Sequence, residues 1–343
     1  MRNFHIPYRT RRLLQRSSIV LLVVTLVAAL VFLCWFVWLK RYVVYTRDQG
    51  AVLDMQLSAQ IPEGNVAIPP EEKDPVNIYY NEGENAINTS KELTHIVGYY
   101  ADTKAWEAGV DQVLQQALAL PTGTPVMLDV KSAKGNFYYS SAVSETRSSN
   151  VDTQAMDELI AWLKKSGMYT IACVPALRDR EYGLHHTGDG IHHSSRGYLW
   201  MDDMGCYWLN PMSGGTLNYL TQTVNELKAL GFHEVLLSDF SIPVSNNIYF
   251  DGDRSQALTS AANTIVTSCA TGSFTVSFMG STSFTLPEGR CRLYMENVEP
   301  SGINSAVEAS GVSDPLIQLV FLTTLYDTRF EKYSALRPLS SAH

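Results

Sequence analysis

The chain has 343 residues, of which 45% are hydrophobic and 17% are charged, and its formal net charge is −8. This length and composition suffice for one sizeable folded domain with added segments, and they exclude a collagen-like or fully disordered chain. The first 47 residues carry eight Lys or Arg and no acid, so the remaining 296 residues sum to −16. That charge disfavours nucleic acid and other polyanions as partners.

The first segments of the chain predict a membrane anchor. Residues 1–18 form a basic N-terminus, and residues 19–39 are an apolar run without a charge, long enough to cross a bilayer as one helix. Five basic residues precede the run and three follow it, which favours a cytoplasmic N-terminus and an extracytoplasmic C-terminal domain. The run is long for a signal-peptide core and ends in bulky side chains, so we expect a single-pass, uncleaved anchor.

Residues 40–94 predict a juxtamembrane segment and a linker. Their hydrophobic periodicity is weak, and residues 61–92 hold four prolines and seven acids against two lysines. Such a composition is typical of a solvated connection between folded parts.

Four cysteines follow the linker, while Cys34 lies in the apolar run. The four are Cys173, Cys206, Cys269 and Cys291. They allow three complete disulfide pairings, and the sequence neither chooses among these nor excludes free thiols. None has a CxxC spacing, so a zinc ribbon has no support.

Residues 95–335 alternate short apolar runs with amphipathic stretches, the pattern of strands and helices around a parallel sheet. Predicted strands are 96–100, 125–130, 169–175, 234–239, 274–278, 291–296 and 316–322, with an eighth near 198–201. Predicted helices are 106–118, 153–166, 215–230 and 255–269, and Gly167 and Gly231 suit left-handed caps at two of their ends. We therefore predict an α/β fold of the (β/α)8 TIM-barrel type, with a doubly wound open sheet as the alternative. No GxGxxG motif follows the first strand to support dinucleotide binding.

Acids occur where several of these strands end. In a barrel the chemistry gathers at the C-terminal ends of strands, and there the sequence has Asp129, Asp239 and Glu296, with Asp179 after the third strand. Such carboxylates could supply the general acid and the nucleophile or base of glycoside hydrolysis. Lys131 lies two residues after Asp129, hence on the same face of the strand, where the two could form an ion pair.

Other side chains near the predicted strand ends are candidates for substrate binding. These are Lys131, Arg178, Trp200, Tyr207, Trp208 and Asn210. The aromatic rings could stack on sugars or pack the barrel rim. The long loop 177–199 contains four histidines around Asp189, but it lacks a helical HxxxH spacing, so we expect no metal and no other cofactor.

The motifs VGYY, LDVKSAKGNFYYSS, KKSGMYTIACVPALRD, WLNP and GFHEVLLSDFSIP resemble, in order and spacing, a family known as "putative glycoside hydrolase". It consists of glycosidase-like TIM barrels in bacterial envelope proteins, and the resemblance spans about residues 94–244. It implies a glycan-related function in the bacterial cell membrane. Asp129, Lys131 and Asp179 match charged positions of the family.

The chain departs from the family at two motifs. The family's fourth-strand signature, Asp-Tyr-x-Arg-Phe-Pro, falls on residues 238–243, where Ser238 precedes Asp239 and the arginine is absent. A shift of one residue directs the carboxylate to the opposite face of the strand unless the backbone bulges. The family's Trp-x-Asp-Pro becomes Trp208 to Pro211, with Asn210 in place of the acid.

Three hypotheses follow, and the sequence leaves open whether the protein is an enzyme. In the first, a membrane-anchored extracytoplasmic glycoside hydrolase acts on envelope or environmental polysaccharide. Asp239 or Asp129 is then the nucleophile or electrostatic stabiliser, and Glu296 or Asp179 is the proton donor. In the second, which the altered fourth strand favours, a catalytically degenerate barrel binds a carbohydrate polymer. In the third, the barrel is a scaffold for envelope protein partners.

Overall fold

The computed structural model describes residues 93–342 apart from 144–149, 196 and 280–283, and before them residues 43–46 and 50–53 and five residues between 25 and 35. The chain divides into two units, Met1–Ile78 and Tyr79–His343. In the first unit, β1 (Val43–Thr46) pairs antiparallel with β2 (Gly50–Leu53). The expected anchor at 19–39 and linker at 40–94 fall mostly outside the described residues. No helix within the described part is long and apolar enough to cross a membrane.

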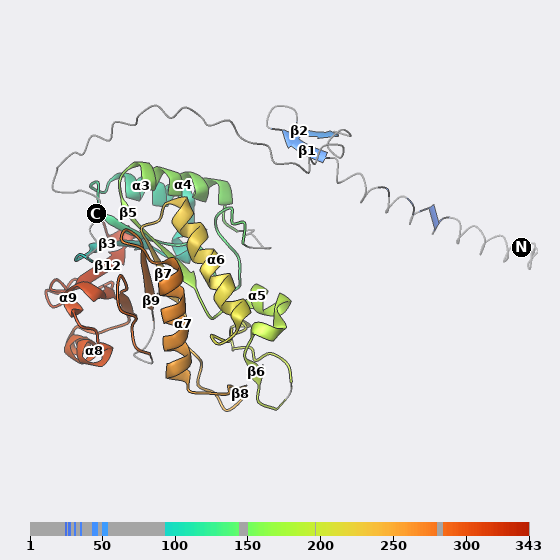
Figure 1. Ribbon diagram of the computed structural model, residues 1–343. Helices are drawn as coiled ribbons and strands as arrows, with labels where there is room; N and C mark the ends of the chain where they lie inside the picture. Colours follow the sequence, from blue (N-terminus) through green and yellow to red (C-terminus); the bar gives the residue numbers. More distant parts are fainter. Residues whose placement is uncertain are drawn as a thin grey trace, which may run out of the picture. The chain divides into compact units, whose positions relative to one another are not determined.

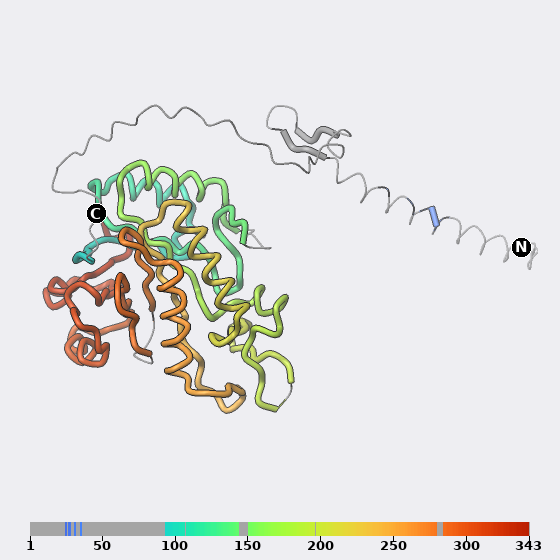
Figure 2. Tube along the Cα trace, in the orientation of Figure 1, coloured from blue at the N-terminus to red at the C-terminus, as the bar shows by residue number. Residues whose placement is uncertain are grey.

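The second unit contains eight parallel strands that close into a barrel, which confirms the predicted fold and excludes the open sheet. In order around the barrel they are β3 (Val97–Ala101), β4 (Pro125–Asp129), β5 (Tyr169–Pro175), β7 (Glu234–Ser238), β9 (Thr275–Met279), β10 (Leu293–Glu296), β11 (Leu319–Leu322) and β12 (Ser334–Pro338). The last strand pairs with the first, with Ala335 opposite Val97, so the red and cyan ends of this unit lie side by side (Figure 2).

One predicted strand was wrong. The eighth strand is β12, which extends past the predicted boundary at residue 335, and residues 198–201 lie instead in the long loop. There the backbone makes only isolated antiparallel bridges, from Leu199 to His192 and from Met201 to Tyr207. Because these residues pair locally within their loop, they supply no edge to the barrel.

Helices surround the barrel, with α6 and α7 packed beside each other (Figure 1). The helices are α2 (Thr103–Ala108), α3 (Val110–Leu118), α4 (Thr153–Lys165), α5 (Arg180–His185), α6 (Gly214–Leu230), α7 (Arg254–Cys269), α8 (Ile303–Ser310) and α9 (Pro315–Gln318). Short 3-10 helices are η3 (Thr187–Asp189), η4 (Pro300–Gly302) and η5 (Leu339–Ser341), and β6 (His192–His193) pairs with β8 (Ile248–Tyr249).

Local sequence explains where the long helices begin and end. The side chains of Asp152, Ser213 and Asp253 accept hydrogen bonds from the first backbone N–H groups of α4, α6 and α7. At the C-terminal ends, Gly231 has φ 100° and Gly167 has φ 69°, as the sequence predicted.

Alternation along the strands separates two apolar layers. On β4 and β7, Val126, Leu128, Val235 and Leu237 pack outward against the helices. The intervening side chains fill the barrel interior with a separate cluster, made of Ile96, Met127, Ile171, Cys173, Leu236, Tyr294, Val320 and Leu336. This period of two residues directs whatever follows in the same register to the mouth of the barrel.

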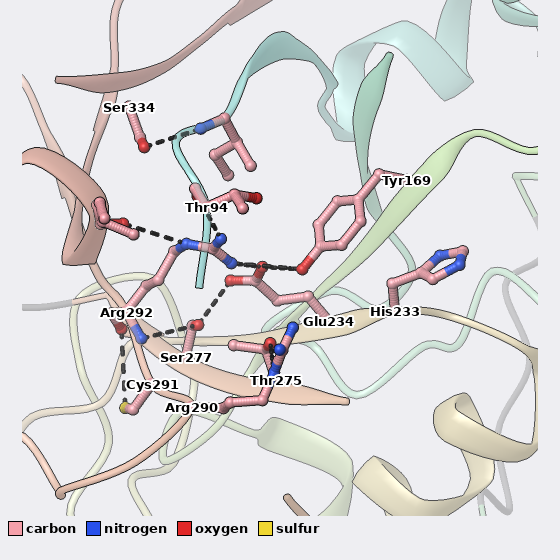
Figure 3. Close-up of polar contacts among 12 residues, drawn as sticks. Thr94, Tyr169, His233, Glu234, Thr275, Ser277, Arg290, Cys291, Arg292 and Ser334 are labelled. Carbon is pink, nitrogen blue, oxygen red and sulfur yellow. Dashed lines mark hydrogen bonds and ion pairs between the residues drawn. The ribbon is translucent and has the colours of Figure 1, made fainter. Parts of the chain in front are cut away.

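A buried polar cluster closes the opposite, N-terminal end of the barrel (Figure 3). Glu234 accepts hydrogen bonds from the hydroxyls of Tyr169 (2.8 Å), Ser277 (2.6 Å) and Tyr294 (2.9 Å), and it forms an ion pair with Arg292. Both charged side chains are almost completely buried. Burial alone would lower the pKa of Arg292, but Glu234 together with Tyr169 and Tyr294 raises the pKa above its ordinary value. These side chains satisfy one another's hydrogen bonds and charges, and we call them the N-terminal plug.

The four cysteines of the second unit, Cys173, Cys206, Cys269 and Cys291, are all free and buried.

Candidate active site

A cleft of about 740 Å3 lies at the C-terminal mouth of the barrel, and we call it the mouth cleft. It is lined by the ends of seven of the eight strands and by the residues that follow them. Its acidic side chains are Asp102, Asp129, Asp239, Glu296 and Glu299. Three of the four predicted catalytic acids therefore share one cleft, and Asp179 does not line it.

Asp129 reaches the cleft because it continues the inward register of β4, two residues after Met127. Its Oδ2 accepts hydrogen bonds from the backbone N–H (3.0 Å) and the hydroxyl (3.3 Å) of Thr103. Burial raises its pKa to about 6, even though the Cys173 and Thr103 hydrogen bonds act in the opposite direction. The carboxyl group can therefore hold or release a proton close to neutral pH.

Asp239 reaches the same cleft by a change of backbone conformation. On β7 the inward register passes through Leu236 to Ser238, so straight continuation would direct Asp239 outward. Instead Asp239 has φ 50°, in the left-handed region, and its side chain lines the cleft. Burial raises its pKa, while the positive charges of Arg178 and Lys131 partly counteract this. Within the described residues, no hydrogen bond or ion pair contacts its carboxylate.

Backbone strain is concentrated at this cleft. Only two non-glycine residues of the described chain have positive φ, Asp239 and Asn297 at 57°, and both line the cleft directly after a strand. Such conformations cost on the order of 1 kcal/mol or more and are enriched at functional sites. Because both conformations lower the stability of the fold, their presence at the mouth cleft indicates that this site is functional.

Cys173 and Tyr100 lie among the acids of the mouth cleft, and both have a pKa that these acids raise. Cys173 lies opposite Asp129 in the β4–β5 register, and its thiol hydrogen-bonds with the side chains of Asp129 and Ser238. Burial, followed by the charge of Asp129, raises the thiol pKa well above its ordinary value, so the sulfur stays protonated. The pKa of Tyr100 is raised by burial and then by Asp102, Glu296 and Asp129. Glu296 is the exposed last residue of β10. Because β10 lies opposite β4 in the closed barrel, Glu296 lies across the mouth from Asp129.

Lys131 and Asp179 form a buried ion pair of 2.7 Å, which corrects the expected pairing of Lys131 with Asp129. The reason is that β4 ends at Asp129, so the alternation rule no longer applies two residues later. Asp179 also accepts a hydrogen bond from the hydroxyl of Tyr219 (2.8 Å) and caps α5 through the backbone N–H of Tyr182 (2.9 Å). Its carboxylate thus contacts three protein donors and does not line the mouth cleft.

The remaining predicted binding residues lie in the surrounding loops and do not line the mouth cleft. Arg178 pairs with Asp202 at 2.7 Å, and the same carboxylate accepts a hydrogen bond from the indole N–H of Trp208 (3.0 Å). Trp200 packs against the outer apolar layer, and the side chain of Asn210 accepts a hydrogen bond from the backbone of Met212.

Tyr207 is in the same region. A Cβ added at Gly183 would lie 2.6 Å from the Cβ of Tyr207, so this ring packs closely on α5.

Among the residues the structure describes, no group of three or more His, Cys, Asp or Glu could hold a metal ion.

Sequence reasoning missed Asp102, Glu299, Tyr100, Thr103 and Cys173. Asp102 and Glu299 carry the same signal as the acids that were predicted, because each follows an apolar strand by a few residues. The other three give no such signal. Their contribution depends on which strands become neighbours in the closed barrel.

Part of the chain matches a known family. Residues 99–265 match the model of a family described as "Putative glycosyl hydrolase domain". Comparison with curated proteins gives no match. Among solved structures, the glycoside hydrolase domain of PelA from Pseudomonas aeruginosa is 11% identical, with coverage of 72% of this chain and 95% of that chain and a TM-score of 0.43.

Two further structures are similar. TtGalA, an alpha-galactosidase from Thermus thermophilus, is 11% identical, with coverage of 62% of this chain and 43% of that chain and a TM-score of 0.43. A hypothetical protein from Ruminiclostridium thermocellum is 15% identical, with coverage of 53% of this chain and 96% of that chain and a TM-score of 0.45.

Proposed function

We propose that the barrel hydrolyses glycosidic bonds in the mouth cleft. The observation that carries the proposal is that Asp129 and Asp239 line one cleft from strands on either side of β5. Most glycosidases use two carboxyl groups, one that protonates the leaving oxygen and one that stabilises or attacks the sugar carbon. The match of residues 99–265 to a glycosyl hydrolase family supports the same reaction.

Asp129 is the proton donor in this proposal. Its pKa of about 6 leaves part of the population protonated near neutral pH. Thr103 holds Oδ2 through two hydrogen bonds and the Cys173 thiol contacts the same carboxyl group, so the protein fixes the group that delivers the proton to the glycosidic oxygen. After the leaving group departs, the carboxylate of Asp129 accepts a proton from the attacking water.

Asp239 is the second carboxylate. Without a protein partner in the described chain, its charge is available to the positive sugar carbon that develops in the transition state. The left-handed backbone at this residue holds the carboxylate inward before substrate arrives. Glu296 lies across the mouth, where it can contact the sugar from the other side.

We infer further that the substrate is a polysaccharide of the bacterial envelope or its surroundings and that residues 19–39 anchor the protein in the cell membrane. The charge-free apolar run and its basic flanks support the anchor. Protease treatment of intact cells tests the orientation. An extracytoplasmic barrel is digested without lysis, whereas a barrel that is protected until lysis contradicts this inference.

Hydrolysis is tested by incubating the protein with purified envelope polysaccharides and measuring new reducing ends. We expect Asp129→Asn and Asp239→Asn each to lower the rate at least about 100-fold, the usual contribution of a general acid or a charge stabiliser. The matched control is Asp203→Asn, because Asp203 is exposed and does not line the cleft. Equal rates in the parent and both cleft variants would refute the proposal.

A second candidate is glycan binding without cleavage. Ser241 occupies the position where the resembling family has arginine, so a positive charge of that family's site is missing. Binding that survives both cleft substitutions, with no sugar released by the parent protein, would select this function.

A further inference from the structure

The charges that line the mouth cleft all have one sign. Five carboxyl side chains line it, Asp102, Asp129, Asp239, Glu296 and Glu299, and within the described lining there is no Lys, Arg or His. A concave site with low-dielectric walls and one sign of charge concentrates ligands of the opposite sign.

The nearest cations do not neutralise these acids. Lys131 is buried in its ion pair with Asp179, and Arg178 is paired with Asp202. Neither lines the cleft, and although both charges lower the pKa of Asp239, burial still leaves that pKa raised. Lys104 is exposed and borders a neighbouring pocket together with Asp102.

The acids of the mouth cleft also differ from the buried acids elsewhere in the barrel in what they contact. Glu234 and Asp179 each accept several hydrogen bonds and an ion pair from the protein. By contrast, no hydrogen bond or ion pair within the described chain contacts the carboxylates of Asp239, Glu296 or Glu299. Their acceptor oxygens are left for a ligand that brings donors and positive charge.

We infer that the mouth cleft selects sugars with a free, protonated amino group over N-acetylated, neutral or acidic sugars. This inference rests on the proposed function, because it takes the cleft as the place where the glycan binds. An ammonium group on the ring brings three donors and a positive charge to Asp239, Glu296 and Glu299, whose carboxylates no donor or ion pair of the described chain contacts. A uronic or sulfated sugar would instead bring a like charge into the site.

The experiment compares two ligands that differ only in the amino group. Isothermal titration of the full chain uses the β-1,4-linked glucosamine hexamer and its fully N-acetylated counterpart, and the same pair in the galactosamine series covers the other ring epimer. The titration is done at about pH 5.5, where most of the amines are protonated although sugar amines are weaker bases than an α-amino group, whose pKa is about 8. At low salt we expect the amine form of at least one series to bind about tenfold more tightly than its acetylated form.

Salt and two matched variants test whether the preference arises from the charge of the sugar rather than from its shape. Because exposed charges are screened, the preference should shrink several-fold at about 0.5 M salt. Glu299→Gln should also lower it, since this removes one charge of the cleft. Glu308→Gln should not, because Glu308 is exposed on α8 and does not line the cleft. A galacturonic acid hexamer should bind more weakly than either form.

The outcomes keep this inference distinct from the proposed hydrolysis. Equal binding of the amine and acetylated forms, or no binding of either in both series, overturns the inference. A preference that Glu299→Gln leaves unchanged overturns it as well. Sugar release from neutral or acetylated glycans only would also overturn it while the proposed hydrolysis stands. Amine-selective binding without sugar release would support the inference and refute hydrolysis.

Discussion

Replacing Glu234 by glutamine measures how much the N-terminal plug stabilises the barrel. The amide has nearly the shape of the carboxylate, but it removes the negative charge and turns one of two acceptor oxygens into a donor. In the parent protein Oε1 accepts from Ser277 and Tyr294, and Oε2 accepts from Tyr169 and Arg292. Two donors would lose their acceptor, and a guanidinium that cannot deprotonate would stay buried without a counter-charge.

Breaking a buried ion pair in this way costs about 3–5 kcal/mol. A domain of this kind has about 5–15 kcal/mol of total stability, so Glu234→Gln should remove a large fraction of it. The measurement is urea unfolding followed by tryptophan fluorescence and circular dichroism, with the slope m checked for constancy. The double variant with Arg292→Met should lose less than the sum of the two single losses, because the stranded cation is removed together with its partner.

The control for this prediction is the ion pair between Asp327 and Arg329, which lies at the surface with its charged atoms 2.7 Å apart. Asp327→Asn should leave the unfolding midpoint unchanged, since exposed pairs add little. If Glu234→Gln unfolds within about 1 kcal/mol of the parent with an unchanged slope, the buried pair is not what stabilises this end of the barrel.

Three further predictions concern the acids near the mouth. The folded-state pKa of Asp129 is about 6, above its ordinary 3.8. The stability that protonation of this group adds to the fold is therefore complete below about pH 4 and is lost as pH rises through 6. Asp129→Asn should therefore gain stability relative to the parent between pH 4 and pH 7, by at most about 3 kcal/mol, while losing hydrolysis, as unfolding at several pH values checks. Asp239→Gly should raise the free energy of unfolding by about 1 kcal/mol because it relieves the left-handed conformation, and Asp239→Ala, which keeps the Cβ, should not. Asp179→Asn should cost about 3–5 kcal/mol by stranding Lys131, yet keep the rate per folded molecule within a few-fold, and a large loss of rate would return Asp179 to the catalytic set.

Much of the fold was predictable because short apolar runs alternate with amphipathic stretches along the chain. Apolar runs of suitable length predicted seven of the eight barrel strands, and acids at their ends predicted that Asp129, Asp239 and Glu296 share the mouth cleft. The eighth strand escaped because its residues, SALRP, contain few apolar side chains and lie far along the chain from their partner β3.

The rest of the site depends on geometry that no local pattern carries. Straight alternation would turn Asp239 outward unless the backbone bulged, and its positive φ is what brings it into the cleft. The partner of Lys131 was predicted incorrectly because the strand ends before that residue. Glu234 and Arg292 meet only because β7 and β10 are brought together through β9 in the closed ring.

Closure of the ring by β12 has a consequence during synthesis. Until residues 334–338 have left the ribosome, β3 and β11 each keep one row of backbone N–H and C=O groups without a partner. A nascent chain at this stage is open to intermolecular strand pairing, so a holding chaperone matters most for the final residues. Deleting β12 should accordingly yield aggregates rather than a smaller folded domain.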